Sequence, residues 1–517
     1  MKKSVCMYIM LLTVMLLASC SGEKCYVNVL PEEPGVVYAF DLKQLVQKSE
    51  LSAEDIRTLV DELKNTVGSG VNVQGTELLD KVFANPEESG LDLRQKVYLF
   101  TDTKLAQAGL LACVNDKAKL DELVGLLETQ QVVKQVENKE GYRQGLVEKG
   151  LLAYSESSCL LLFSETEAGL QKWASELMGQ EGKGTFSQTK AFESMERMEG
   201  DISAYASMAL LPDEYKTVMK ASVPAAINWR DIDVVAGIHF EKGRMLLDME
   251  TVVSDEMKKE YEKIRPIYAK ETSDRFLKLF PKDGFMWINM GLKGERLYEI
   301  MEKEPTMAAQ LQSVQSMFDL KSLLGAIDGE VAFCISSVQP AVFAMLAEVK
   351  NTDFVKSFES LKPMLEMTGG QMKLVETGTN TYELQLADGR MAGMASGASS
   401  IYIGVKDNVF YLTNDKQCAE QKEADHSMKE AVWADHVSGK RCFMAMNWDA
   451  LSAIVGGDSH RIYSSKDQIA RMLLNYMDYI TLEALDDTHG RIEVGMKDKE
   501  TNVLKQWIGM GKQLSIR

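Results

Sequence analysis

The sequence has no apolar run of about 18 residues, the length that a membrane-spanning helix needs. It also has no tract rich in lysine and arginine, and 76 acidic residues face 58 basic ones, so the formal net charge is −18. An excess of negative charge repels a phosphate backbone, which argues against nucleic acid as a partner. The 517 residues, of which 45% are hydrophobic and 26% charged, instead have the composition of a folded, soluble protein of several domains.

Motifs that carry chemistry are missing as well. The sequence has no HExxH, HxxEH or EF-hand pattern, no G-x-S-x-G elbow and no phosphate-binding loop of the P-loop type. No two of its five histidines have the spacing of metal ligands on a helix; they are His239, His426, His436, His460 and His489. We therefore predict no catalytic residue, no metal site and no cofactor.

Carboxylates occur in pairs, for example Asp231 with Asp233 and Asp486 with Asp487. Two carboxylates can hydrolyse a glycoside only when the fold holds them at a set distance across a cleft. The sequence contains no sign of such an arrangement, and a protein of this net charge has carboxylates over its whole surface. These pairs are therefore interpreted as surface residues.

The N-terminus has the pattern of a bacterial lipoprotein signal. Lys2 and Lys3 precede an apolar run that ends in Leu17-Ala18-Ser19-Cys20. A short positive segment, an apolar stretch too brief to span a bilayer and small residues at the cleavage site are typical of a signal peptide. The cysteine directly after Leu-Ala-Ser resembles the lipidation site of this class, so Cys20 is predicted to be acylated and residues 1–19 to be removed.

Two or three acyl chains on Cys20 exceed what reversible membrane binding requires, so the chain is expected to be firmly anchored while its body stays in water. Ser21, rather than an aspartate, follows the cysteine, and Ser21–Lys24 lack an acidic cluster. Both features favour the outer membrane, with the body on the periplasmic face rather than the cell surface. The membrane is thus a predicted partner, through the anchor at Cys20, and an apolar ligand or an envelope protein partner is a further candidate.

The remaining cysteines are far apart and form no CxxC pair, which excludes zinc ribbons and thioredoxin-type redox motifs. Several lie in apolar, strand-like runs, where a buried free thiol acts as a small hydrophobe. One or two disulfides are an alternative in an oxidising compartment, with the pairing left open. The six residues concerned are Cys25, Cys113, Cys159, Cys334, Cys418 and Cys442.

The chain resembles itself at an interval of about 240 residues. Leu30–Tyr38 match Phe280–Ile288 without a gap, and both segments lead from a proline-containing turn into an apolar run and a helix. These helices are predicted over Leu42–Lys48 and Leu292–Glu302. Lys96–Phe100 correspond to Glu330–Cys334, and Leu110–Val114 to Met345–Val349. Asn, Asp and Thr, which are typical of helix N-termini, follow the latter runs and predict helices over 120–127 and 354–361.

We interpret this pattern as a tandem duplication of an α+β domain, in which each copy is a largely antiparallel sheet with packed helices. The predicted organisation is a signal peptide (1–19), a lipidated tether (20–25), a first domain (26–253), a connector (254–279) and a second domain (280–517). In the connector, Met257, Tyr261, Ile264 and Tyr268 recur at helical spacing, and Pro266 is expected to end or kink the helix. The closing hairpins are predicted to turn at 241–244 and 488–491.

A short N-terminal motif supports a family assignment. Tyr26–Pro31, followed by Phe40–Leu45 and then Lys48-Ser49, resembles the mature N-terminus of a family of uncharacterised lipoproteins from Bacteroidota-type bacteria. That family carries a domain of unknown function, and the lipoprotein cysteine just upstream is part of the same pattern. The resemblance implies an envelope lipoprotein and transfers no catalytic residue.

Methionine is unusually frequent, with 30 residues, and pairs occur at MxxM spacing, as in Met195/Met198, Met364/Met367 and Met391/Met394. Core filling is the ordinary role of methionine, and soft-metal binding or an adaptable apolar groove are the alternatives.

The preferred hypothesis is a lipid-anchored envelope protein with a non-enzymatic binding or structural role. The alternatives are a periplasmic carrier of a lipid or other apolar ligand and a cryptic hydrolase of envelope glycan or peptide.

Overall fold

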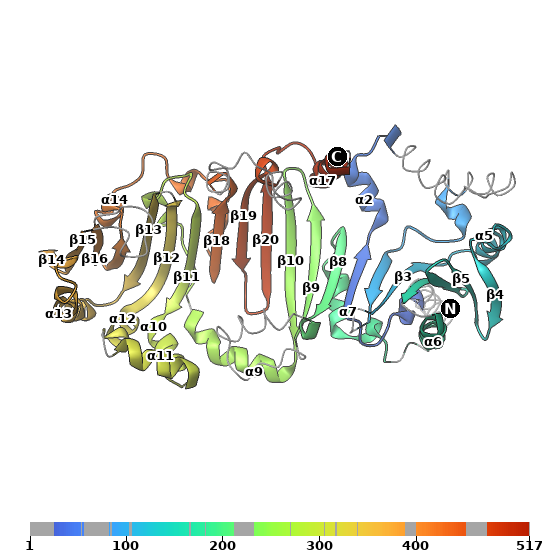
Figure 1. Ribbon diagram of the computed structural model, residues 1–517, viewed down its shortest axis with the longest axis horizontal. Coiled ribbons are helices and arrows are strands. Elements are labelled where there is room, and N and C mark those ends of the chain that lie inside the picture. Colours follow the sequence, from blue (N-terminus) through green and yellow to red (C-terminus); the bar gives the residue numbers. More distant parts are fainter. Residues whose placement is uncertain are drawn as a thin grey trace, which may run out of the picture.

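The computed structural model shows a mixed α+β protein built on one antiparallel sheet (Figure 1). It describes residues 25–515 apart from 53, 56–81, 83–84, 103–105, 165–166, 181, 183, 211–231, 269, 304, 316–317, 339, 388–399 and 451–472. The predicted α+β class is therefore correct. The predicted lipidation site, Cys20, lies outside the described residues, and so do Asp231, His460 and the Met391/Met394 pair.

The N-terminal half of the sheet contains ten strands, each antiparallel to its neighbours. Their order across the sheet is β4 (Lys134–Lys139), β5 (Tyr142–Val147), β6 (Gly150–Tyr154), β7 (Ser158–Ser164), β3 (Gln107–Cys113), β2 (Val97–Thr101), β1 (Val36–Phe40), β8 (Ile202–Ser207), β9 (Ile232–Phe240) and β10 (Arg244–Val253).

The C-terminal half repeats this order strand for strand. It runs β14 (Met372–Gly378), β15 (Thr381–Leu386), β16 (Ser400–Lys406), β17 (Val409–Thr413), β13 (Ala341–Val349), β12 (Ile327–Val338), β11 (Met286–Lys293), β18 (Cys442–Asn447), β19 (Met477–Ala484) and β20 (His489–Met496). The central strands correspond residue by residue: Val37 is paired between β2 and β8 as Trp287 is between β12 and β18, and both side chains are fully buried.

The two halves meet at a seam, where β10 pairs with β20 so that Asp248 lies opposite Arg491 (Figure 1). One sheet therefore runs through the whole molecule, and its outermost strands are β4 and β14. Both outer strands have a shift of register against their only partner, between Lys134 and Glu137 in β4 and between Glu376 and Gly378 in β14.

One face of each half is covered, and the cover differs between the halves. In the N-terminal half it consists of the 3₁₀ helices η1 (Cys25–Val29) and η3 (Phe186–Gln188) with α6 (Glu167–Met178) and α7 (Lys190–Arg197). In the C-terminal half, only short segments cover the sheet: η7 (Leu277–Leu279), α14 (Lys416–Ala419), η10 (Met428–Glu430) and η11 (Ala434–His436). We call this side of the sheet the covered face.

The described helices cover the other face of the sheet only in parts. The outer end of the N-terminal half packs against α5 (Lys117–Thr129), and that of the C-terminal half packs against α12 (Leu320–Ala326), η8 (Asp353–Leu361) and α13 (Lys362–Glu366), next to α10 (Gly294–Lys303) and α11 (Pro305–Gln315). Near the seam, α17 (Val503–Ser515) packs beside α2 (Leu42–Ser49) at one end of the strands (Figure 1). The connector helix α9 (Asp255–Ile264) lies at the other end (Figure 1).

Short 3₁₀ helices complete the described structure: η2 (Pro86–Ser89), η4 (Met208–Leu210) and η6 (Arg265–Tyr268). The predicted end of the connector helix is confirmed, because α9 stops at Ile264 and Pro266 lies in η6. None of the helices in the described part of the chain combines the length and hydropathy needed to cross a bilayer.

Three local predictions need correction. The second closing turn does not lie at 488–491, because β20 already begins at His489. The turn lies before it, where the Asp486 side chain accepts hydrogen bonds from the N–H groups of Thr488 and His489. Residues 353–361 form a 3₁₀ rather than an α-helix. The helix after β11 begins at Gly294 rather than at Leu292, which still belongs to the strand.

Candidate functional site

The most unusual surface of the molecule is the middle of the second sheet face. Antiparallel sheets with one solvated face normally alternate apolar and polar residues. Here strands such as β1 and β18 carry apolar residues on both faces. The seam strands β10, β19 and β20 carry apolar residues on this face and charged ones, such as Asp248, Glu483 and Arg491, on the covered face. A set of apolar residues on this face is only partly buried. None of them belongs to a buried apolar cluster in the described structure; they are Tyr38, Leu99, Ala204, Ala236, Leu247, Met249, Ile288, Met290, Phe333, Met345, Met444 and Leu482. We call this set the open face.

The open face continues across the seam without a break. Leu247 of β10 lies opposite Ile492 of β20, and Ile492 lies opposite Leu482 of β19. The same row then continues through Met444, Ile288, Phe333 and Met345. Leu482 is 40% exposed and Tyr38 39%. Contiguous exposed apolar surface of this kind marks binding sites in soluble proteins.

Four of the twelve open-face residues are methionines. Met249, Met290, Met345 and Met444 belong to the open face, whereas Met195 is fully buried under the covered face. Methionine is flexible and polarisable, so it adapts to ligands of irregular shape. The structure thus brings together methionines that the sequence pattern assigned mainly to core filling. The sequence feature that could have predicted the open face is the run of apolar residues at successive strand positions.

A network of ion pairs lies on the covered face along the seam. Arg491 donates two hydrogen bonds to Asp248, of 2.6 and 3.1 Å, and this bonding raises the pKa of Arg491. Buried Glu493 accepts from the Tyr479 hydroxyl at 2.5 Å and lies 3.4 Å from Arg244. Because each carboxylate has a donor, the network has the character of a structural junction.

Three histidines belong to the same region. His239 lies 3.6 Å from Asp248, His436 lies 3.6 Å from Glu483, and His489 lies 2.8 Å from Asp486. His426 is elsewhere, 3.5 Å from Glu430. Within the described residues, no three His, Cys, Asp or Glu side chains form a group that could hold a metal ion.

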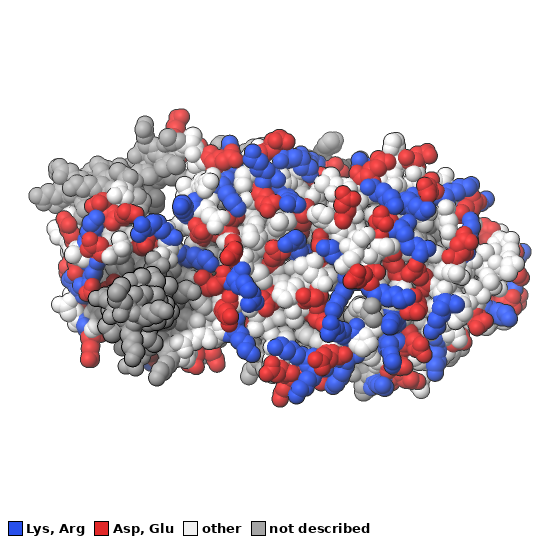
Figure 2. Space-filling view, turned by 180° about the vertical axis from the view of Figure 1, so that it is seen from behind, with Lys and Arg blue, Asp and Glu red and all other residues white. Residues whose placement is uncertain are grey.

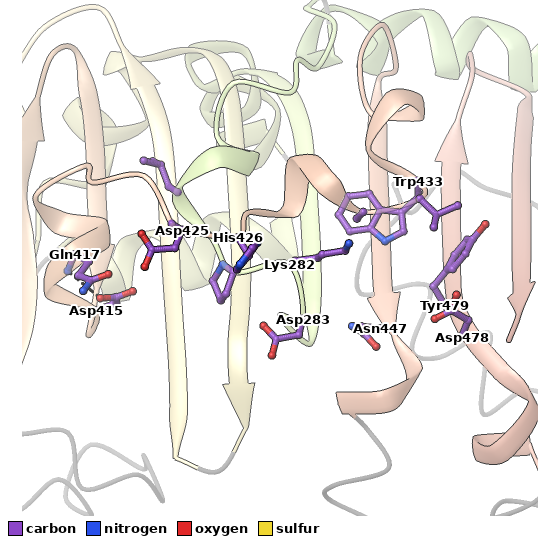
Figure 3. Close-up of a pocket in the computed structure, with 15 residues that line it drawn as sticks. Lys282, Asp283, Asp415, Gln417, Asp425, His426, Trp433, Asn447, Asp478 and Tyr479 are labelled. Carbon is purple, nitrogen blue, oxygen red and sulfur yellow. Dashed lines mark hydrogen bonds between the residues drawn. The ribbon is translucent and has the colours of Figure 1, made fainter.

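A shallow hollow of about 760 Å³ lies at the strand ends of the C-terminal half (Figure 3). Figure 3 shows Lys282 between His426 and Trp433. Three polar groups there serve the local fold: Asp415 caps α14, Asp478 pairs with Lys499 at 2.6 Å, and the Tyr479 hydroxyl turns to Glu493. These three groups are therefore engaged in structural contacts.

A second hollow, of about 690 Å³, lies where η6 meets the ends of β18 and β19. We call it the polar hollow; its lining is Glu262, Arg265, Pro266, Tyr268, Lys270, Glu271, Gly439, Arg441 and Leu485. Both Arg265 and Arg441 pair with Asp487. On the face seen in Figure 2, acidic and basic side chains are interspersed and no large area has a single sign.

The carboxylate and cysteine candidates are dispersed. Asp486 and Asp487, adjacent in the sequence, have different partners, His489 for Asp486 and Arg441 for Asp487. Burial raises the pKa values of Asp233 and Glu330, but these residues lie in different halves of the sheet. Cys113, Cys159, Cys334, Cys418 and Cys442 form no disulfide with one another, and the side chain of Cys25 is outside the described structure.

Comparisons with known proteins give one clear relationship. The model of a family described as "Domain of unknown function (DUF4836)" matches residues 26–504. No curated protein matches. Among solved structures, crystal form I of TP0453 is similar to this chain at 9% sequence identity and a TM-score of 0.25. The match covers 47% of this chain and 85% of the TP0453 chain. The match to crystal form IV of TP0453 covers 44% of this chain and 79% of the TP0453 chain, at 10% sequence identity and a TM-score of 0.26. Such low TM-scores do not establish a common fold.

Proposed function

We propose that this chain, which belongs to the family with the domain of unknown function DUF4836, is a lipid-anchored cell-envelope protein that binds an apolar ligand on its open face. The binding is non-enzymatic in this proposal, and the duplicated sheet is its rigid support. One observation carries it: twelve partly exposed apolar residues form a single surface across both halves of the sheet.

The size of the surface favours a large apolar ligand. Neighbouring strands lie about 4.8 Å apart, so a row that crosses seven strands from β10 to β13 extends over about 29 Å. An acyl chain or a similar elongated apolar group fits this length. Contact with such a ligand removes these partly exposed side chains from water. The binding free energy gained is about 25 cal/mol per Å² of apolar area buried.

The predicted anchor favours a membrane lipid as the source of that ligand. Four residues, Ser21–Lys24, separate the predicted acylated Cys20 from η1. Fully extended, they span at most about 14 Å, so the anchored body would stay next to the lipid surface. The strand order that both halves share supports the predicted duplication, in which the domains 26–253 and 280–517 supply one face each.

The environment of the carboxylates favours binding over hydrolysis. Glu330 accepts from Ser273 and Asn289, and Asp233 accepts from Tyr205, so each is enclosed by donors in its own half. A hydrolase of the retaining or inverting type needs two carboxyl groups across one cleft. A single open apolar face fits a carrier or docking module better.

The anchor is tested by mass spectrometry of the protein purified from a bacterial envelope. We expect a mature chain that begins at Cys20 with two or three acyl chains attached. A Cys20→Ser variant should lack these chains and leave the membrane fraction. A variant that partitions like the parent would contradict the anchor.

The ligand site is tested with residues 20–517 exported behind an ordinary secretory signal and carrying Cys20→Ser. Native mass spectrometry should show bound lipid in this form. The double substitution Leu247→Glu/Leu482→Glu places charges on both sides of the seam and should lower the bound fraction at least tenfold. Met367→Glu is the matched control, because Met367 is 80% exposed and lies outside the open face. A parent protein without bound or bindable lipid would refute the proposal.

A further inference from the structure

The polar hollow adjoins the open face at the seam. Arg441, in its lining, directly precedes Cys442 of β18, whose side chain lies in the same row as Met249 and Met290. Leu485, also in the lining, directly follows Ala484 of that row. A ligand on the open face therefore has a polar site at its edge, which suits an amphipathic molecule.

The hollow presents charges of both signs. Glu262 and Glu271 are exposed and have no ion-pair partner among the described residues. The guanidinium of Arg265, which is 63% exposed, lies 3.5 Å from Asp487. Lys270 lies 3.6 Å from Asp328 and also donates to its backbone carbonyl. The cations are thus partly satisfied, whereas the two glutamates are available to a positive group.

A headgroup that carries both signs is complementary to this arrangement. An ammonium group can lie against Glu262 and Glu271 and over the ring of Tyr268, which is 39% exposed. The adjacent phosphate can then take hydrogen bonds from Arg265. A purely anionic headgroup would leave both glutamates unpaired and repelled, so the charges disfavour it.

We infer that the polar hollow and the open face together form one site for a zwitterionic phospholipid, with its ammonium–phosphate headgroup in the hollow and its acyl chains on the open face. This inference rests on the proposed apolar binding and adds the identity of the headgroup. The short distance between the predicted anchor and the body supplies such lipids at close range.

The test measures equilibrium binding of three short-chain phospholipids to the soluble full chain described above. Phosphatidylethanolamine and phosphatidylcholine probes should bind about fivefold tighter than a phosphatidylglycerol probe with the same chains, as two exposed charge contacts predict. The variant Glu262→Gln/Glu271→Gln should lose this preference and keep tail binding. Glu256→Gln, on the exposed side of the same α9, is the matched control and should keep it.

The outcomes separate the two proposals. Equal binding of all three probes, reduced together by Leu247→Glu/Leu482→Glu, would overturn the headgroup assignment and leave apolar binding intact. Tighter binding of phosphatidylglycerol would also overturn it. If none of the probes binds, the proposed function itself fails.

Discussion

The two halves of the sheet have the same strand order under different covers. The N-terminal half is covered by two regular helices and a cluster of rings that includes Tyr26, Phe186 and Phe192. The C-terminal half is covered by short 3₁₀ segments around Phe280, Trp287 and Trp433. The same strand order is therefore compatible with different covering segments. A covering segment needs only to pack side chains of suitable total volume against the apolar face of the sheet.

The largest expected effect tests the equivalence of the two central positions. Trp287→Ala should lower the free energy of unfolding by about 4 kcal/mol, because a fully buried indole leaves a large cavity. Val37→Ala, at the matching position, should cost about 2 kcal/mol, since a smaller side chain is lost. Urea unfolding followed by circular dichroism measures both. Equal losses would show that the two halves are not packed on these residues in the same way.

A smaller effect is expected at the seam that joins the halves. A double-mutant cycle with Asp248→Ala and Arg491→Ala should give a coupling energy of about 1 kcal/mol, because the pair is bidentate but partly exposed. The exposed pair Arg296–Glu299 on α10 is the control and should show no measurable coupling. A seam coupling equally small would mean that backbone pairing alone joins the two halves.

Acidification should weaken the outer end of the N-terminal half. Burial raises the pKa of Asp121, but hydrogen bonds from Lys117, Tyr154 and Arg143 outweigh it and lower the pKa to about 2. The ionised form therefore stabilises the folded state, and this contribution is present above pH 4 and lost as the pH falls toward 2. Asp121→Asn should remove about 1 kcal/mol of the stability difference between pH 6 and pH 2.5. An unchanged pH profile would contradict the role of Asp121.

The smallest effect on stability is expected on the open face. Leu482→Ser should change the free energy of unfolding by less than about 0.5 kcal/mol, because Leu482 is 40% exposed and lies outside the buried clusters. Leu346→Ser, on the covered face of β13, should cost several times more, since this side chain is fully buried. A large loss for Leu482→Ser would show that the open face is a structural core rather than a binding surface.

Local patterns in the sequence predicted much of the fold. Asp116 and Asp41 precede helices that begin where the N-cap preference places them, and Pro266 ends the connector helix. The seam could not be predicted in this way, because β10 and β20 are paired across more than 200 residues and their contact has no local sequence signal. The turn before His489 was misplaced because Gly490 suggested a turn, whereas it lies within β20 opposite Ala484.

The candidate site was only partly foreseen. The alternative of a carrier predicted an apolar ligand but no residues that bind it, although strands such as Val36–Phe40 are apolar at every position. Which apolar residues remain uncovered depends on where helices such as α9 and α17 pack, and this is decided by tertiary contacts far away in the chain. The polar hollow likewise joins η6 to β18, more than 170 residues later, so no motif could reveal it.

The seam also bears on self-association. Strand β10 is paired with β9 and β20, and β20 with β10 and β19, so neither is an edge at which another copy could add a strand. Among the described strands, β4 and β14 are the edges, and β4 carries Lys134, Glu137 and Lys139 besides its register shift. Charges and irregular pairing at an edge hinder intermolecular strand addition, so the long sheet is protected against fibrous growth from the β4 end.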